Sequence, residues 1–153
     1  MINVISGDMF QGNHEAIVNP INCVGIIGKG IAAQCKQLYP KMFEEYQGLC
    51  LLRKLSPGNV WYYKTEVDQP KYILNLATKD HWRDPSELDW IVTGCKHLVQ
   101  VLMTKWITNV GIPSIGCGNG KLDWNIVKPY LIEILDSNLW LKEWCNITIY
   151  EPQ

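Results

Sequence analysis

The sequence predicts a three-layer α/β/α domain with a mixed, mostly parallel central sheet of about six strands. Short runs rich in β-branched and aromatic residues alternate with segments of helical period, which is the pattern of a sheet covered by helices on both faces. Two of these runs lie close together within residues 60–76 and indicate an antiparallel portion of the sheet. The predicted strands are residues 2–6, 16–19, 60–63, 72–76, 109–112 and 147–150.

Apolar residues at helical spacing predict the helices. The clearest stripe covers residues 88–102, and we expect Ser86 to be its N-cap. A second stripe covers residues 31–39 and stops at Pro40, after which residues 42–49 continue as a separate short helix.

A third helix is predicted from Asp123, whose carboxylate can cap it, to residue 135. Pro129 lies inside this segment, where it removes a backbone donor and crowds the preceding turn. We therefore expect a kink or a later start in this helix.

Length and charge limit the possible functions. We expect residues 1–153 to form one domain, because this is the usual length of one, and we expect it to be monomeric. We also expect it to be cytoplasmic, because no apolar run approaches the roughly 18 residues of a membrane span and the first residues do not resemble a signal peptide. The 14 Lys and Arg residues are balanced by 15 Asp and Glu residues, which argues against broad electrostatic binding of nucleic acid and leaves a local contact open.

Cysteine and histidine spacing gives no indication of a metal site. The six cysteines are far apart, form no C-x-x-C pair, and have no histidine at the spacing of zinc ligands. We expect most of them to be small core residues.

Two glycine-rich segments, residues 19–32 and 113–121, each lie between a predicted strand and a predicted helix. The backbone N–H groups of such loops and the positive end of a helix dipole favour a phosphate, and two of them suggest a diphosphate. For either loop alone, a simple turn is an equally good interpretation. The spacing Gly28-x-Gly30-x-x-Ala33 lacks the strand context of a dinucleotide fingerprint, and the loop lacks the hydroxyl residue of a nucleotide-triphosphatase motif.

A polar and aromatic loop, residues 75–85, contains Lys79. A lysine acts as a nucleophile or base only when it is unprotonated, which requires burial or nearby positive charge. Neighbouring aromatic residues and Arg83 provide both, although a solvated surface lysine is the ordinary alternative.

Four segments together resemble the macrodomain family, most closely the antitoxin macrodomains that remove ADP-ribose from DNA. They are Gly7-Asp8, residues 18–32 with Val-Asn-Pro-Ile-Asn-Cys-Val-Gly and Gly-Lys-Gly-Ile-Ala, residues 75–83 with Asn-Leu-Ala-Thr-Lys-Asp-His-Trp-Arg, and residues 116–124 with Gly-Cys-Gly-Asn-Gly-Lys-Leu-Asp-Trp. The similarity covers nearly the whole chain and implies a macrodomain fold that binds ADP-ribose without a cofactor.

The resemblance also implies roles for individual residues. Asp8 would accept a hydrogen bond from the adenine amino group, Asn22 would contact the distal ribose, the two glycine loops would enclose the diphosphate, and Lys79 would be catalytic. The residues implied for ADP-ribose binding are Asp8, Met9, Asn22, Cys23, Val24, Gly28, Lys29, Gly30, Ile31, Thr78, His81, Trp82, Arg83, Gly116, Cys117, Gly118, Asn119, Gly120, Lys121, Leu122 and Tyr150.

The activity implied by the resemblance is hydrolysis of the N-glycosidic bond between ADP-ribose and a base, with thymidine-linked ADP-ribose on single-stranded DNA as the expected substrate. Related glycohydrolases that act on proteins pair their lysine with an aspartate where this chain has Gly120, which favours DNA over protein. Two alternatives remain at this point: a non-catalytic ADP-ribose-binding domain and an ADP-ribose 1″-phosphate phosphatase.

Overall fold

The computed structural model describes residues 1–153 and contains a six-stranded sheet with the strand order β1-β6-β5-β2-β4-β3. All neighbouring strands are parallel except β3 and β4, which are antiparallel as predicted. Each predicted strand is present and ends within two residues of its expected bounds. The strands are β1 (Ile2–Ile5), β2 (Ala16–Ile21), β3 (Val60–Lys64), β4 (Tyr72–Ala77), β5 (Asn109–Ile112) and β6 (Asn146–Tyr150).

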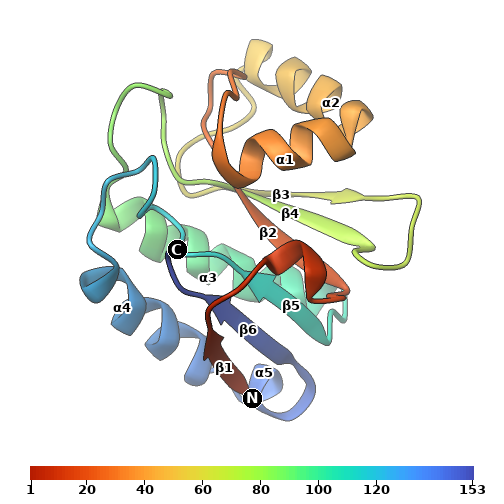
Figure 1. The fold of residues 1–153 in the computed structure, drawn as a ribbon, viewed down its shortest axis with the longest axis vertical. Coiled ribbons are helices and arrows are strands. Elements are labelled where there is room, and N and C mark those ends of the chain that lie inside the picture. The colour runs from red at the N-terminus through yellow and green to blue at the C-terminus, as the bar shows by residue number, and fades with distance from the viewer.

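Helices cover both faces of this sheet, so the three-layer prediction is confirmed (Figure 1). The helices α1 and α2 pack on one face, and α3, α4 and α5 pack on the other. None of them combines the length and the hydropathy needed to span a membrane. Their bounds are η1 (Met9–Gln11, a 3-10 helix), α1 (Gly30–Leu38), α2 (Pro40–Leu51), α3 (Leu88–Thr104), α4 (Trp124–Asp136) and α5 (Leu139–Trp144).

The strands bury side chains on both faces because successive residues point in opposite directions. In β2, Ala16 and Val18 belong to a core of 22 buried residues beneath α3, α4 and α5, whereas Ile17 packs with Cys35 of α1 and Met42 of α2. The larger core therefore lies between the sheet and α3, α4 and α5, and the smaller one lies between the sheet and α1 and α2.

The long helix α3 begins at Leu88 as predicted, but Ser86 is not its N-cap. The N-cap is Glu87, which makes no side-chain capping bond. Ser86 is buried instead, its backbone N–H donates to Gly120 O at 2.9 Å, and its hydroxyl has no hydrogen-bond partner. The hydrogen bond to Gly120, which belongs to the loop after β5, thus uses Ser86 to join two loops and not to cap α3.

The expected disturbance at Pro129 does not delay the helix. α4 starts at Trp124 and continues through Pro129. A proline in a helix interior costs about 3 kcal/mol, but full burial of an apolar side chain contributes roughly 1.5–3 kcal/mol. Because α4 buries Val127, Leu131 and Leu135 on the core, tertiary packing outweighs the lost backbone bond.

Asp123 caps α4 as predicted, since its Oδ1 accepts a hydrogen bond from the backbone N–H of Asn125 at 2.9 Å. Asp123→Ala is expected to lower the free energy of unfolding by about 1 kcal/mol, because one N-terminal N–H loses its acceptor. Urea unfolding measures this change. Glu143→Ala, which removes an exposed carboxylate from α5, is the control and should leave stability within about 0.5 kcal/mol. Equal unfolding midpoints for the two variants would contradict the capping role.

Candidate functional site

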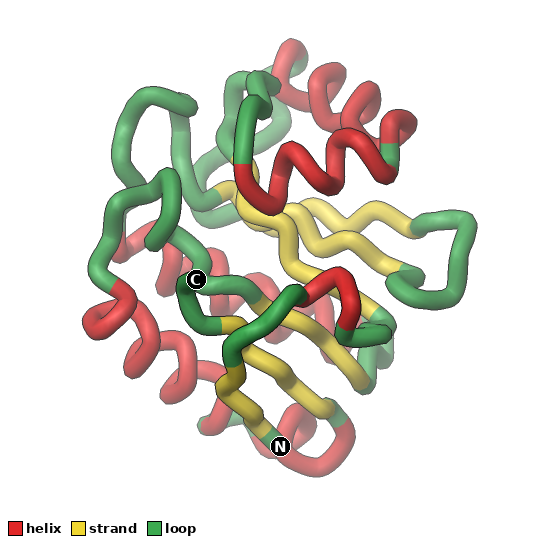
Figure 2. Tube along the Cα trace, viewed as in Figure 1, coloured by secondary structure: helices red, strands yellow, loops and turns green.

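Three loops meet at the carboxyl ends of β2, β4 and β5, which lie side by side in the sheet (Figures 1 and 2). The loop after β2 joins the loop after β4 through a hydrogen bond from Cys23 N to Asp80 O at 3.0 Å. The loop after β4 joins the loop after β5 through Lys79, whose Nζ lies 3.2 Å from Asn119 O. This edge of an open α/β sheet is where ligands bind.

Lys79 lies at the centre of these loops. Its side chain is buried, with 8% of the residue exposed, and Nζ donates to Trp82 O at 2.8 Å as well as to Asn119 O. The ion pairs of the structure join other lysines, so no carboxylate lies within 4.0 Å of this amine. The solvated-lysine alternative is therefore wrong for Lys79.

The surroundings of Lys79 lower the pKa of its amine. Burial lowers this pKa below its usual value, and the positive charges of Lys121 and Lys29 lower it further, while Asp84 opposes them. A neutral amine has two N–H groups and one lone pair. In that form, the two carbonyl oxygens would accept the two N–H groups and the lone pair would be left for a substrate.

The two thiols predicted at the site are poor nucleophiles in these surroundings. Burial, with a smaller contribution from Asp80 and Cys50, raises the pKa of Cys23 to about 12. Burial and the charge of Asp123 raise the pKa of Cys117 to about 11. Since the thiolate is the reactive form, neither thiol is a candidate nucleophile, and Lys79 remains the candidate reactive side chain of these loops.

Asn22, which was expected at the distal ribose, is buried and engaged in its own loop. Its Nδ2 donates to Ile26 O at 2.8 Å, and its Oδ1 accepts from Val24 N at 3.0 Å and from the Tyr46 hydroxyl at 2.8 Å. The Tyr46 hydroxyl also lies 2.8 Å from Asn22 O. Tyr46 thus holds the loop from α2, a role that its place in an apolar stripe did not indicate.

A cleft of about 350 Å³ lies farther along this carboxyl edge of the sheet, where β1, β5 and β6 end. Asp8 and Tyr150 line it, as the resemblance implies for the adenine end. Asp8 Oδ1 accepts a bond from Phe10 N at 2.9 Å and caps η1, which fixes the carboxylate at the cleft. The lining residues are Gly7, Asp8, Met9, Phe10, Ile31, Gln34, Pro113, Ser114, Tyr150, Glu151, Pro152 and Gln153.

His14 forms a hydrogen bond with the Tyr150 hydroxyl and was not among the predicted residues. Its Nε2 lies 2.7 Å from the Tyr150 hydroxyl and its Nδ1 lies 2.6 Å from Asn109 Oδ1. The two ring nitrogens of His14 therefore link Asn109 of β5 to Tyr150 of β6. A lone histidine before a strand carries no pattern that would have identified this role.

The cleft and Lys79 are connected through the glycine loops. Ile31 lines the cleft, and the residue before it is Gly30, which has a positive φ of 73°. A Cβ on Gly30 would lie 3.6 Å from the side chain of Asn119. The backbone O of Asn119 in turn accepts from Lys79 Nζ. The helix dipole of α1 adds positive potential where Gly30 begins the helix. The predicted diphosphate loops therefore lie between the predicted adenine end and the amine.

The glycine loop after β5 has no room for a side chain at Gly120. A Cβ there would lie 2.4 Å from both Gly116 O and Ser86 Oγ. By contrast, a Cβ at Gly118 would meet no atom within 4 Å. The remaining predicted residues lie in these same three loops, with Thr78 and Gly116 buried and Val24, Gly28, Lys29, Arg83 and Lys121 exposed.

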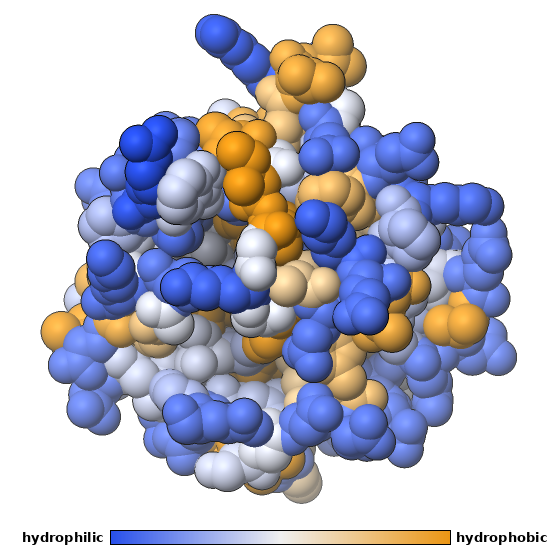
Figure 3. Space-filling model, turned by 45° about the horizontal axis from the view of Figure 1, so that its top comes forward, coloured by the Kyte–Doolittle hydropathy of each residue, from blue (hydrophilic) through white to orange (hydrophobic).

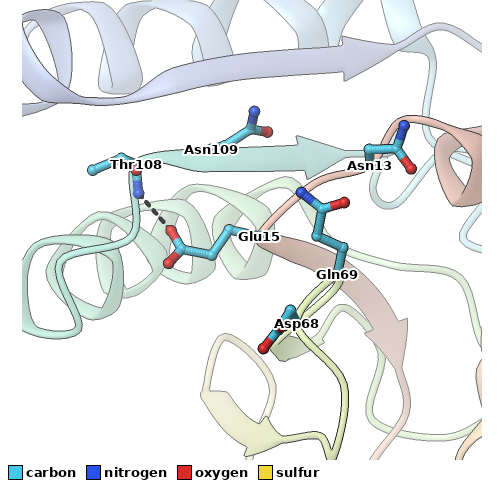
Figure 4. A pocket seen from close by; sticks show the side chains of 6 residues that line it. All are labelled: Asn13, Glu15, Asp68, Gln69, Thr108 and Asn109. Atoms are coloured by element: carbon cyan, nitrogen blue, oxygen red, sulfur yellow. Dashed lines mark hydrogen bonds between the residues drawn. The ribbon is translucent and has the colours of Figure 1, made fainter.

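A wide polar hollow of about 720 Å³ lies at the opposite edge, at the amino ends of β2 and β5 (Figure 4). Glu15 Oε1 accepts from Thr108 N there at 2.8 Å. Its lining contains no apolar side chain and none of the predicted site residues, namely Asn13, Glu15, Asp68, Gln69, Thr108 and Asn109. We therefore place the functional site at the carboxyl edge.

Known proteins are similar to this chain in both sequence and fold. The family described as Macro domain matches residues 18–131. A protein of Mycobacterium tuberculosis named DNA ADP-ribosyl glycohydrolase is 43% identical over 133 residues, which are 86% of this chain and 38% of that protein. The chain thus spans less than half of the length of this relative.

Solved structures agree with this similarity. The macrodomain of Mycobacterium tuberculosis DarG has a TM-score of 0.93 at 39% identity, covering 100% of this chain and 99% of that one. Thermosipho africanus DarTG in complex with ADP-ribose has a TM-score of 0.87 at 28% identity, covering 98% of this chain and 42% of that one. The family match and these similarities show that the chain belongs to the macrodomain family.

Proposed function

We propose that this chain is an ADP-ribosyl glycohydrolase that releases ADP-ribose from modified DNA, with thymidine in a single strand as the substrate. The observation that carries this proposal is the buried Lys79 amine, which two backbone carbonyls hold at the meeting point of three loops. The similarity to the DNA ADP-ribosyl glycohydrolase of Mycobacterium tuberculosis supports the same reaction.

In this proposal the adenine of ADP-ribose lies in the cleft beside Asp8 and Tyr150. The diphosphate lies against the glycine loops, whose backbone N–H groups and helix dipole suit an anion. This order directs the distal ribose toward Lys79. Since the three loops are bonded to one another, they can hold the sugar in one position.

The reaction breaks the bond between ribose C1″ and the base nitrogen. Water supplies the oxygen that remains on C1″ and the proton that leaves with the base. Whether Lys79 attacks C1″ first or takes a proton from the attacking water, its amine must arrive uncharged. Burial and two neighbouring cations lower the pKa of the amine, which shifts its equilibrium toward that form.

Three substrates test the proposal directly. The chain is incubated with a thymidine-ADP-ribosylated oligonucleotide, with a protein carrying ADP-ribose on glutamate, and with ADP-ribose 1″-phosphate. Release of ADP-ribose from the oligonucleotide at the highest kcat/KM is the expected result. Phosphate release from the small molecule would identify a phosphatase, and tight calorimetric binding of ADP-ribose without any product would identify a binding domain.

The pH dependence of the reaction should respond to Lys121. Removing this positive charge makes protonation of Lys79 easier, so Lys121→Gln is expected to raise the pKa of Lys79 toward its ordinary value. Activity that needs the neutral amine rises with pH through this pKa. The rising limb of the kcat/KM profile, measured between about pH 6 and pH 10, should therefore move to higher pH in the variant.

The matched control for this shift is Lys142→Gln, which removes an exposed cation in α5, where Lys142 pairs with Asp136. Its profile should coincide with that of the unmodified protein. A fall in kcat/KM by the same factor at every pH in Lys121→Gln would instead show that Lys121 only binds the substrate.

A further inference from the structure

The loop after β4 presents an aromatic and cationic surface beside Lys79. Trp82 is 45% exposed, and the guanidinium carbon of Arg83 lies 5.2 Å from the centre of its ring. The His81 ring lies beside it, with a distance of 5.6 Å between ring centres and an angle of 33° between the planes. We call these three side chains the aromatic ledge.

The backbone of the ledge contacts the amine directly. Trp82 O accepts from Lys79 Nζ at 2.8 Å, and the backbone N–H of Arg83 donates to His81 Nδ1 at 3.2 Å. The residue that carries the exposed indole is therefore also a residue that holds Lys79.

The ledge contains a cation of its own. The guanidinium of Arg83 lies against the Trp82 ring, whereas the other charges of the three loops are mixed, with Lys29 and Lys121 beside Asp80, Asp84 and Asp123. Aromatic rings combined with local positive charge are the composition that binds single-stranded nucleic acid, because bases stack on the rings and phosphates approach the cations.

Apolar side chains extend this surface. Val24 and Ile26 of the loop after β2 are 38% and 55% exposed, and that loop is joined to the loop of the ledge by the bond from Cys23 N to Asp80 O. Figure 3, in which the top of Figure 1 is turned forward, shows apolar surface bordered by hydrophilic side chains on this side of the molecule. Stacking on such a surface requires a base with a free face, which a base inside a duplex does not have.

We infer that the aromatic ledge of His81, Trp82 and Arg83 holds a base adjacent to the modified nucleotide of a single DNA strand, and so makes the chain prefer an oligonucleotide over an isolated nucleotide. This inference rests on the proposed function. It adds the strand around the modification to what the protein recognises, whereas the cleft and glycine loops recognise only ADP-ribose.

The test compares two substrates with the same glycosidic bond, an ADP-ribosylated single-stranded oligonucleotide and ADP-ribosylated thymidine monophosphate. In Trp82→Ala, the ratio of the two kcat/KM values is expected to fall roughly 5- to 150-fold, with most of the change in the KM of the oligonucleotide. Trp82→Phe keeps a ring and should retain much of the ratio. Arg83→Gln should lower the ratio and weaken its dependence on salt.

Trp106→Ala is the matched control, since Trp106 is a more exposed tryptophan, at 72%, that follows the far end of α3. This variant should have the same kcat/KM as the unmodified protein on both substrates. An equal loss on both substrates in Trp82→Ala, an unchanged ratio, or an equal loss on an ADP-ribosylated peptide would overturn the inference.

Binding measurements separate this inference from the proposed function. Fluorescence anisotropy of the labelled, modified oligonucleotide needs no turnover, and Trp82→Ala should weaken that binding more than it weakens the binding of free ADP-ribose. If the unmodified protein binds the oligonucleotide but releases no product from any substrate, the proposed function fails while the ledge is still tested. If turnover occurs and binding by the variant is unaltered, only the ledge fails.

Discussion

Lys79→Ala is expected to lower kcat on an ADP-ribosylated oligonucleotide by two to four orders of magnitude, the usual contribution of a positioned acid, base or nucleophile. The variant loses the lone pair that two carbonyl contacts leave available. Single-turnover release of ADP-ribose measures the effect, and calorimetry measures whether ADP-ribose still binds.

Binding should persist because the loops keep other connections. Cys23 N still donates to Asp80 O, and Ser86 N still donates to Gly120 O. Lys79→Arg tests the need for a neutral group, since a guanidinium stays charged and should be nearly as inactive as alanine. Lys142→Ala is the control: it removes an exposed lysine far from these loops and should keep full activity. Activity of Lys79→Ala equal to that of the unmodified protein would remove this residue from the mechanism.

Gly120→Ala should disrupt the loop after β5, because its Cβ would collide with Gly116 O and Ser86 Oγ. Relief of such overpacking costs typically about 1–3 kcal/mol, and we expect the free energy of unfolding to fall by that amount and the affinity for ADP-ribose to fall with it. Thermal unfolding and calorimetry with ADP-ribose measure the two effects. The backbone carbonyl cannot move aside as a flexible side chain would.

Gly118→Ala is the matched control for stability, since it places the same methyl group in the same loop where no atom lies within 4 Å. The two variants should differ in unfolding temperature by several degrees. Gly120→Asp meets the same collision, so an aspartate cannot be added at this position without rearranging the loop. Stability of Gly120→Ala equal to that of Gly118→Ala would contradict this account.

The sheet was predictable because its strands carry their signal locally. β-branched residues fill runs such as residues 147–150, and burial on the core requires that composition. The six-residue helix α5 was missed because it is shorter than a clear helical period and depends on Asn138, whose Oδ1 accepts from Leu141 N. The later start expected at Pro129 does not occur, since the local penalty of this proline is smaller than the burial gained by the whole of α4.

The site was predictable as a meeting of loops but not in its bonds. Strand ends and glycine-rich segments indicated where Lys79 would lie. Its contacts are with the carbonyls of Trp82 and Asn119, however, and every residue has a carbonyl, so no residue type marks them. The support of Asn22 by Tyr46 likewise depends on how α2 packs on the loop, which is set by the tertiary fold.

Because main-chain atoms hold the amine, the identities of residues 82 and 119 are free to change without loosening it. Selection can therefore replace the side chains that face the polymer while the reacting group keeps its place. Under the proposed function, substitutions on this surface would alter which strand is bound and leave the backbone contacts of the amine in place.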